Sequence, residues 1–434
     1  MKHALVLLSA IVALNTGAVA GEFSGTLNSQ TAYGTHDHAL QQQEWLLDLE
    51  YNGELWGGDI TAIARARLDT VDGLNSKNSE RPSTYSSING PIISGDSGEL
   101  QIREFYWDKS TDNTYWRLGK QQVVWGEADG LKLLDVINPQ NFREFVLDDF
   151  DDARIPLWMI NAEFSLSDNG VLQVLWIPDS STHEIAPNHS EFALTSPLFV
   201  PSLENIPAAS TVLIKPDEAP ASVFKDSDFG TRYTTFVSGW DLSANYLYHY
   251  VDAPITHTEF ANDTITIDQR YHRSHLLGGT ASTALGDWTL RGEIAFETDI
   301  YQRTKSALPG LRQANQWSSV IGLDWQGLSD QFISLQWFQT TLLGDRQQRI
   351  VKKRENTVSF LWESKFANET LSLEWLHLHS TDHGDGLIQP ELRYNYEENF
   401  DIYVNAAVFY GEAHERFGQF DQADRIALGF TWGF

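Results

Sequence analysis

The polar–apolar alternation that runs through most of this chain breaks in one stretch, Arg117-Leu-Gly-Lys-Gln-Gln-Val-Val-Trp-Gly-Glu-Ala-Asp-Gly-Leu-Lys-Leu-Leu-Asp-Val-Ile-Asn-Pro-Gln-Asn-Phe-Arg-Glu-Phe-Val-Leu-Asp-Asp-Phe-Asp-Asp-Ala-Arg-Ile-Pro-Leu-Trp158. The stretch starts as a strand and continues as a mixture of acids, arginines and bulky apolar residues. It regains strand-like alternation near Leu157. Alternating strands with polar turns lie on both sides. The pattern predicts a segment that folds inward between two strands of a barrel wall.

The N-terminus has the pattern of a targeting segment. Lys2 and His3 form a short basic region, residues 4–14 are apolar, and Ala18-Val19-Ala20 is a small-residue cleavage site before Gly21. The apolar core is too short to span a bilayer well. We therefore interpret residues 1–20 as a signal peptide and residues 21–434 as a single β-barrel domain.

The C-terminus alternates with a period of two, which indicates a strand with one strongly apolar face. The apolar face comprises Ile426, Leu428, Phe430, Trp432 and Phe434, and the chain ends on this last phenylalanine. Outer-membrane barrels of Gram-negative bacteria end in this way, and their assembly machinery recognises the aromatic end. The ending therefore predicts an outer-membrane location and contact of Phe434 with the barrel-assembly machinery.

Composition agrees with a barrel and excludes several other classes. No mature segment has 18 consecutive apolar residues, so a transmembrane helix is not expected. The 15 Trp and 15 Tyr are enough for two interfacial girdles. The net charge of −29 argues against a nucleic-acid partner. Acidic outer loops bridged by divalent cations to lipopolysaccharide also give such a charge, so outer-membrane lipid and lipopolysaccharide are expected partners. No cysteine is present, and no cofactor is expected.

The rhythm of strands, short turns and longer connections predicts an all-β fold, a transmembrane antiparallel outer-membrane β-barrel of about 18 strands, with 16 as the alternative. Asn52-Gly53 is one expected turn, and 264–284 one expected strand. Residues 178–230 hold seven of the 14 prolines and are expected to form a long Pro-rich extracellular loop. Its apolar run from Phe192 to Leu203 is expected to cap the mouth, contact lipid or meet another protein.

Strand parity places a set of charged residues in the lumen, because an Arg or Lys on the lipid face costs about 2–4 kcal/mol at the bilayer midplane. Two interpretations remain open: a mixed-charge lumen that satisfies itself, or an arginine track that faces acids, holds the inner segment and sets a field for permeants. The residues placed inside are Arg65, Arg67, Arg103, Arg117, Arg291, Glu293, Glu297 and Glu374.

Residues 125–157 are predicted to be the inward-folded loop that fills a lumen of this width. Gly126 and Gly130 permit the departure from the wall, and Asn141 to Phe150 is expected to form a short helix. The loop's acids cannot be buried unpaired, and Arg143, Arg154 and the wall arginines are natural partners. A weaker alternative is a Ca²⁺ site built from Asp148, Asp149, Asp151 and Asp152, although this run lacks the glycine and closing glutamate of an EF-hand loop.

Gly119-Lys-Gln-Gln-Val-Val-Trp-Gly-Glu127, followed by Leu134-Asp-Val-Ile-Asn-Pro139, resembles the signature of a proteobacterial outer-membrane barrel family catalogued as domain of unknown function 1302. Family members typically read Gly-Arg-Gln-x-Val-x-Trp-Gly-Glu, then Asn-Pro, so Lys120 departs from the pattern. The resemblance implies that the protein works together with an inner-membrane transporter of the resistance-nodulation-division type that moves lipid-like molecules.

The sequence favours a channel that passes solutes across a constricted, charged lumen. The alternative is an outer-membrane component of a lipid or hydrophobic-compound export route, with an inner-membrane transporter or periplasmic lipoprotein as partner. A structural or adhesive barrel is a third class. An enzyme is not expected, because His377 and His379 lie beside Ser372 and Ser380 without a nucleophile motif. The residues predicted to control passage are Arg117, Lys120, Glu127, Arg143, Asp148, Asp149, Arg154, Arg65, Arg67 and Arg291.

Overall fold

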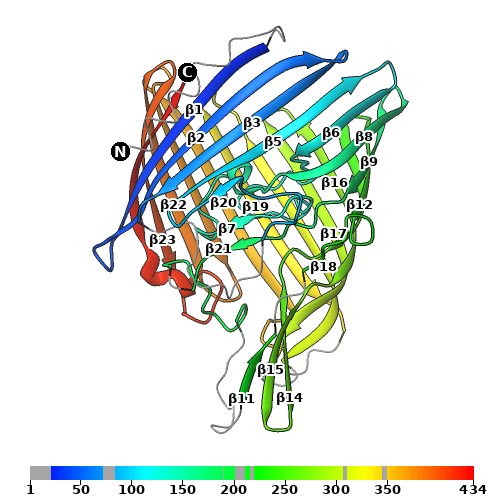
Figure 1. Ribbon diagram of the computed structural model, residues 1–434. Coiled ribbons are helices and arrows are strands. Elements are labelled where there is room, and N and C mark those ends of the chain that lie inside the picture. The colour runs from blue at the N-terminus through cyan, green and yellow to red at the C-terminus, as the bar shows by residue number, and fades with distance from the viewer. Residues whose placement is uncertain are drawn as a thin grey trace.

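The alternating strands close into a barrel (Figure 1) in the computed structural model, which describes residues 21–71, 84–188, 190–200, 211–215, 219–305, 310–344 and 349–434. The predicted signal peptide lies outside the described residues. Within them the wall has 18 antiparallel strands. These are β1 (Gly21–Gly34), β2 (Leu40–Leu55), β3 (Gly58–Asp69), β5 (Gly98–Ser110), β6 (Thr114–Gln121), β8 (Leu157–Ser167), β9 (Gly170–Ile177), β12 (Asp228–Val237), β13 (Trp240–Tyr250), β16 (Arg273–Leu285), β17 (Trp288–Arg303), β18 (Leu311–Trp325), β19 (Gln331–Leu342), β20 (Arg354–Phe366), β21 (Leu371–Ser380), β22 (Gly386–Glu397), β23 (Phe400–Tyr410) and β24 (Arg425–Gly433).

The first and last strands join and close the wall. β1 pairs with β24 from Thr26 opposite Gly433 to Gly34 opposite Arg425. Gly25 N–H donates to the carbonyl of Phe434 at 2.8 Å. Closure pairs the strand edges, which a bilayer requires because its hydrocarbon core offers no hydrogen-bond partners. The prediction of an 18-stranded outer-membrane barrel is confirmed, and the 16-stranded alternative is wrong.

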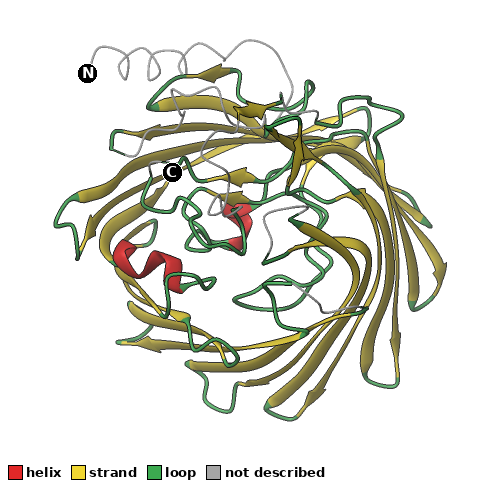
Figure 2. Ribbon diagram, turned by 90° about the horizontal axis from the view of Figure 1, so that it is seen from below, coloured by secondary structure: helices red, strands yellow, loops and turns green. Residues whose placement is uncertain are grey.

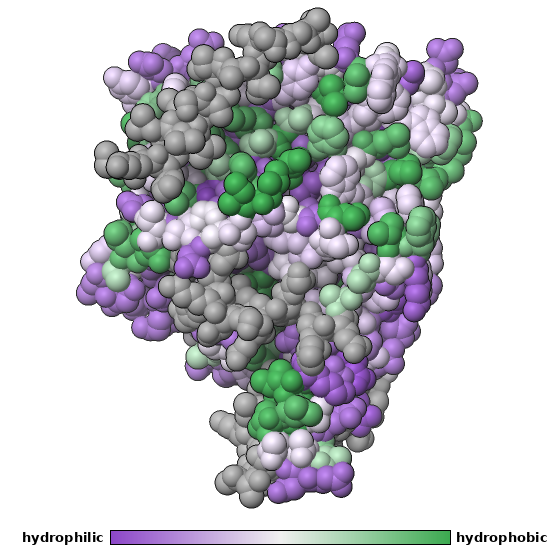
Figure 3. Space-filling model, in the orientation of Figure 1, coloured by the Kyte–Doolittle hydropathy of each residue, from purple (hydrophilic) through white to green (hydrophobic). Residues whose placement is uncertain are grey.

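The two faces of the wall differ as the alternation predicts. On β24, Ile426 and Leu428 are exposed outward at 53% and 62%, whereas Arg425 and Ala427 are buried on the inner face. Figure 3 shows apolar residues gathered on the outer surface of the wall. This band is the lipid-contacting surface of a barrel in the outer membrane. The structure has no helix, among the residues it describes, that is long and apolar enough to cross a membrane.

Short turns and long connections lie at opposite ends of the barrel. The turn between β2 and β3 is Trp56-Gly57, where both residues have positive φ, 53° and 69°. Such backbone angles suit a two-residue hairpin turn. The turn expected at Asn52-Gly53 is therefore wrong, because β2 continues to Leu55. The end with short turns also holds Phe434, and by the usual arrangement of such barrels it is the periplasmic end.

Further strands lie outside the wall on the extracellular side. β14 (Ile255–Ala261) and β15 (Thr264–Arg270) form a hairpin, and β11 (Thr211–Ile214) adds to it in parallel (Figure 1). The single strand expected over 264–284 is thus two strands, β15 and β16. No glycine or proline occurs between Ile265 and Leu277, so no turn signal marks the point where the chain changes partners.

Short elements lie within the ring of strands when the barrel is viewed along its axis (Figure 2). α2 (Phe150–Ala153) and the 3-10 helix η2 (Gly418–Ala423) are the helices of the described chain. β7 (Asn141–Phe142) pairs in parallel with β10 (Glu184–Ile185), and β4 (Ile93–Ser94) adds to β5. The helix predicted from Asn141 to Phe150 is wrong. Residues 143–146 form turns, and the helix begins only at Phe150.

Candidate functional site

The chain leaves the wall after β6 and returns at β8, so residues 122–156 form the inner loop, three residues longer at its start than predicted. Gly119 has φ of 136°, and a Cβ at this position would overlap the carbonyl oxygen of Phe105. Only glycine fits so close to the neighbouring strand. Lys120 is buried and donates its ammonium to the carbonyl of Ile102 at 2.7 Å, beyond the last β5–β6 pair. Lys120 therefore caps an open strand edge.

Two buried amides tie the base of the inner loop together. Asn138 accepts from Val123 N–H at 2.8 Å, and donates to the carbonyls of Gln121 and Ile155 at 3.3 and 3.0 Å. The Gln121 side chain donates to the carbonyl of Met159 at 3.3 Å. Buried backbone groups need such partners. Asn138 thus holds the outgoing and returning strands of the loop in one place.

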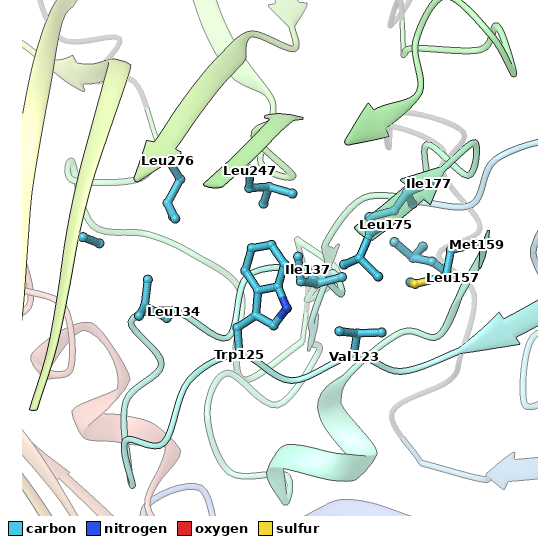
Figure 4. Packing of buried hydrophobic residues seen from close by; sticks show 11 residues of the cluster. Val123, Trp125, Leu134, Ile137, Leu157, Met159, Leu175, Ile177, Leu247 and Leu276 are labelled. Atoms are coloured by element: carbon cyan, nitrogen blue, oxygen red, sulfur yellow. The ribbon is translucent and has the colours of Figure 1, made fainter. Parts of the chain in front are cut away.

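The first half of the inner loop packs on one side of the lumen. Trp125 is 1% exposed and lies among Ile137 from the loop and Leu247 and Leu276 from the wall (Figure 4). Its indole N–H donates to Gln173 on β9 at 2.8 Å. The first apolar cluster comprises Val123, Trp125, Leu134, Ile137, Leu157, Met159, Leu175, Ile177, Leu247, Leu276 and Ala295. It fixes the loop against β8, β9, β13, β16 and β17.

The far part of the inner loop packs across the lumen against β21, β22, β23 and η2. Phe145 lies 4.7 Å from Phe420 and 5.9 Å from Phe417, measured between ring centroids. Phe192 joins this second apolar cluster, so the first part of the run 192–203 caps the mouth from within. Residues 201–203 lie outside the described chain. Because its two halves pack on different walls, the loop spans the lumen.

Arginines of the wall bind the inner loop at several points. Arg65 donates to Asp48 on the neighbouring strand and to Asp152 of the loop, at 2.6 and 2.7 Å. Arg103 donates to the carbonyl of Asp151 at 2.5 Å. Arg425 on β24 donates to Glu144 at 2.5 Å. On the opposite side, Arg291 pairs with Asp129 of the loop and with Asp324 of β18.

The pKa values of the loop reflect this burial. Burial, followed by the nearby Glu144 carboxylate, raises the pKa of Asp148. Although burial opposes it, Arg425 lowers the pKa of Glu144, so Asp148 is the more easily protonated acid of this pair. Burial also lowers the pKa of Lys132 to about 8 against the effect of Asp135. Arginines of the wall and of the loop thus offset much of the loop's acidity.

A row of carboxylates faces the open part of the lumen. Glu363 on β20 lies directly opposite Glu374 on β21, which lies opposite Glu391 on β22. The three form the acidic row. Glu374 is exposed, although its neighbour Leu376 packs against the inner cluster and Trp375 faces outward. A side chain that is both inward and exposed indicates water in the lumen beside the loop.

The acidic row carries little compensating charge. Glu391 pairs with Arg393 at 2.7 Å. Glu363, Glu374 and the nearby loop residue Asp149 have no cation within ion-pairing distance in the described part of the chain. The open lumen beside the loop therefore contains carboxyl groups without a direct cationic partner in the described chain.

A polar cavity of about 520 Å³ lies under the inner loop near the periplasmic turns. Glu127 of the loop borders it, and β12, β13 and β16 supply the other side. Arg232 donates to the carbonyl of Val124 at 3.3 Å and so joins the wall to the loop. The lining includes Glu127, Asn169, Arg232, Thr234, Phe236, Asp241, Ser243, Thr280 and Ser282.

The predicted control residues fall into different places. Arg65, Arg291, Asp148, Asp149, Arg143, Arg154 and Glu127 belong to the inner loop or bind it. Arg67 pairs with Glu44 on the wall. Arg117 pairs with Asp108 at 2.7 Å and stacks on Tyr106 at 4.0 Å, so its partners belong to the wall. Whether these residues control passage stays a prediction.

Sequence reasoning missed Arg425 and the role of Asn138. Arg425 is the first residue of the last strand and meets Glu144 from a distant part of the chain, so nothing local signals the pair. In the sequence, Asn138 stands out only as part of the Asn-Pro pair in the motif that resembles the family signature. As for calcium, Asp152 binds Arg65 and Asp151 binds Arg154. The described chain contains no group of three or more His, Cys, Asp or Glu that could hold a metal ion.

Comparisons with known proteins agree with this architecture. The family described as "Protein of unknown function (DUF1302)" matches residues 9–434. No curated protein matches the chain. Among solved structures, Pseudomonas aeruginosa OpdK is similar, with 10% identity, a TM-score of 0.53, and coverage of 96% of this chain and 98% of that one. Pseudomonas aeruginosa OccK8 (OprE) has 11% identity, a TM-score of 0.51, and coverage of 96% and 99%. At such identity the likeness concerns the fold.

Proposed function

We propose that this chain, which belongs to the DUF1302 family of proteins of unknown function, is an outer-membrane channel for small cationic or neutral polar solutes. The observation that carries the proposal is the acidic row, which faces water beside a loop that spans the lumen. The inner loop limits the size of the solute, and the acidic row sets the preferred charge.

The lining of the lumen supports a polar permeant. Rings of carboxylates favour cations in membrane pores because they attract the permeating charge and repel anions. Glu363, Glu374 and Asp149 supply such carboxylates without ion-pairing partners in the described chain. Most residues that line the cavity beneath the loop carry hydroxyl, amide or charged groups, and Phe236 and Leu242 add apolar surface. This lining does not favour the alternative route for lipid-like molecules, so we do not propose it.

Solved relatives in fold support a channel in general. One structure of Pseudomonas aeruginosa OpdK, with 11% identity and a TM-score of 0.52, is described with vanillate. A barrel of this architecture therefore admits a small organic molecule. The acidic row would repel an anion. We therefore propose cations and neutral solutes as the permeants of this channel.

The same proposal assigns two contacts at the membrane. Phe434 is 52% exposed at the periplasmic end and lies 5.0 Å from Trp432 between ring centroids. We assign this aromatic pair to recognition by the barrel-assembly machinery. The apolar outer wall contacts lipid, and the acidic extracellular loops contact lipopolysaccharide through divalent cations.

Neutralising the acidic row tests the proposal. In planar bilayers under a potassium chloride gradient, the refolded protein should show a reversal potential of a cation-preferring pore. The double variant Glu363→Gln/Glu374→Gln should lower the cation-to-anion permeability ratio by about two-fold or more, because two carboxylates leave the water-filled lumen.

Asp263→Asn is the matched control, because Asp263 lies in the turn of the β14–β15 hairpin outside the barrel. Its φ of 60° suits asparagine equally well. The control should keep the permeability ratio of the unaltered protein. An anion-preferring pore, or a ratio unaffected by the double variant, contradicts the proposal.

A further inference from the structure

Two imidazoles meet outside the barrel, at the base of the extracellular hairpin. His257 lies on β14, and His272 follows β15 just before β16 begins. Their Nε2 atoms lie 2.9 Å apart. At this distance one ring donates its Nε2–H to the other, or both nitrogens, when unprotonated, can bind one cation. Neither histidine belongs to the inner loop or to the acidic row.

Aromatic packing fixes the direction of both rings. His272 stacks on Tyr301 of β17 with centroids 4.1 Å apart and an interplanar angle of 29°. His257 meets the same tyrosine edge-on at 5.8 Å. Because Tyr301 belongs to the barrel wall and His257 to the hairpin, the imidazole pair bridges the two. A ligand held by both rings would join the hairpin to the wall.

The separation of the two nitrogens can be compared with the geometry of metal sites. Metal–imidazole bonds are about 2.0–2.1 Å long. Two such bonds at a right angle place their nitrogens about 2.9–3.0 Å apart, whereas tetrahedral bonds place them about 3.3–3.4 Å apart. The 2.9 Å separation is the length of an ordinary N–H···N hydrogen bond, and it also matches the right-angle arrangement of two metal bonds. Nickel(II) and copper(II) adopt right-angle geometries with nitrogen ligands, and zinc prefers tetrahedral sites.

The neighbouring charges permit a cation. Arg270 lies on the same hairpin, and its positive charge interacts electrostatically with His257. Its guanidinium is bound by Asp268 at 2.5 and 2.8 Å and lies 3.8 Å from Glu259. The two carboxylates therefore offset its charge. With no third His, Cys, Asp or Glu grouped there in the described chain, water would complete the coordination.

We propose that His257 and His272 form a two-histidine site for a divalent transition-metal cation of the nickel or copper class, which fastens the β14–β15 hairpin to the barrel wall. The site is independent of the proposed channel function. It stands on the facing Nε2 atoms and on the ring stacking that orients them.

Calorimetric titration of nickel(II) chloride into the untagged, refolded protein in detergent tests the site. One saturable site per chain is expected. His257→Ala and His272→Ala should each weaken nickel affinity at least ten-fold, because one remaining imidazole is a much poorer ligand. Zinc should bind more weakly than nickel, since its preferred nitrogen separation is longer.

His377→Ala/His379→Ala is the matched control. These histidines also lie close together, but both bond to the Tyr410 hydroxyl, at 2.9 and 2.8 Å, and their ring centroids are 6.1 Å apart. The control should bind nickel like the unaltered protein. Unchanged affinity in either single variant, loss of binding in the control, or the absence of a saturable site overturns the proposal.

Electron paramagnetic resonance of the copper(II)-loaded protein gives a second readout that needs no variant. Two equatorial nitrogen couplings are expected at one equivalent of copper. One nitrogen or none at that ratio overturns the two-histidine site. This signal reports on the ligands of the metal and not on ionic current. Its outcome is therefore independent of the conductance experiments that test the channel.

Discussion

Single-channel conductance should rise several-fold when residues 130–154 are deleted and the chain is rejoined by a short glycine linker. An 18-stranded wall encloses a space wide enough for an aqueous channel unless something fills it. The inner loop fills it, because the first apolar cluster holds the loop to one wall and the second holds it to another. Removing the crossing part leaves the hydrogen-bonded ring of strands in place.

Planar-bilayer recording of the refolded variant measures the effect. The control is deletion of residues 256–269, most of the hairpin that lies outside the lumen. The hairpin deletion should leave conductance unchanged, and both proteins should keep the heat-modifiable mobility of a folded barrel. Equal conductance of the loop deletion and the unaltered protein would mean that the loop does not restrict the pore, and the constriction would have to be sought elsewhere.

The wall could be predicted from sequence because its signal is local. Each strand carries its own alternation, since lipid lies on one side and water or the loop on the other. On β24, the exposed Ile426 and Leu428 and the buried Arg425 and Ala427 repeat this rule residue by residue. Positive φ at Trp56, a bulky residue, is by contrast a poor signal, which explains why the turn was placed too early.

The contacts of the inner loop could not be predicted in the same way. Its acids were expected to meet wall arginines, and Arg65 and Arg291 do so. The partner of Glu144, however, is Arg425, which is 281 residues away and is brought close only by closure of the barrel. Pairing between distant segments depends on the complete fold. Local patterns therefore identify the charged groups but do not match them.

The predicted helix failed for a related reason. Phe142, Phe145 and Val146 have helical spacing, but their environments differ. Phe142 meets His183, with ring centroids 5.0 Å apart, whereas Phe145 turns toward Phe420 with φ of 55°. A positive φ cannot occur within a regular helix. Burial of the separate aromatic side chains therefore outweighs local helix propensity.

Lys120 makes a structural contact that its sequence pattern does not predict. A cation beside the loop was expected to face permeants. In the structure its ammonium lies 2.7 Å from the Ile102 carbonyl, which β6 no longer covers after leaving the wall. A buried carbonyl without a donor costs about 1–3 kcal/mol. Lys120 supplies the donor and stabilises the departure of the loop.

Replacing Asn138 by aspartate should release the base of the inner loop while the wall stays folded. The substitution keeps the shape but exchanges the Nδ2 donor for an oxygen that faces the carbonyls of Gln121 and Ile155. Two buried hydrogen bonds are lost and a charge is left unpaired, so the free energy of local opening should fall by about 2–4 kcal/mol. Limited proteolysis within residues 122–156 should then proceed at least about ten-fold faster, because cleavage follows the population of the opened loop.

Asn141→Asp is the matched control for this change. Asn141 is also buried in the inner loop, but its Oδ1 accepts from the Arg143 backbone N–H at 3.0 Å, which a carboxylate can do equally well. The control should be cleaved at about the rate of the unaltered protein. Its open-channel current should show no more noise than that of the unaltered protein. Asn138→Asp should instead show added current noise, because a loop freed at its base moves within the conducting space. Equal proteolysis rates for the two variants would show that packing alone, through Trp125 and its cluster, holds the loop, and that the amide at position 138 is dispensable.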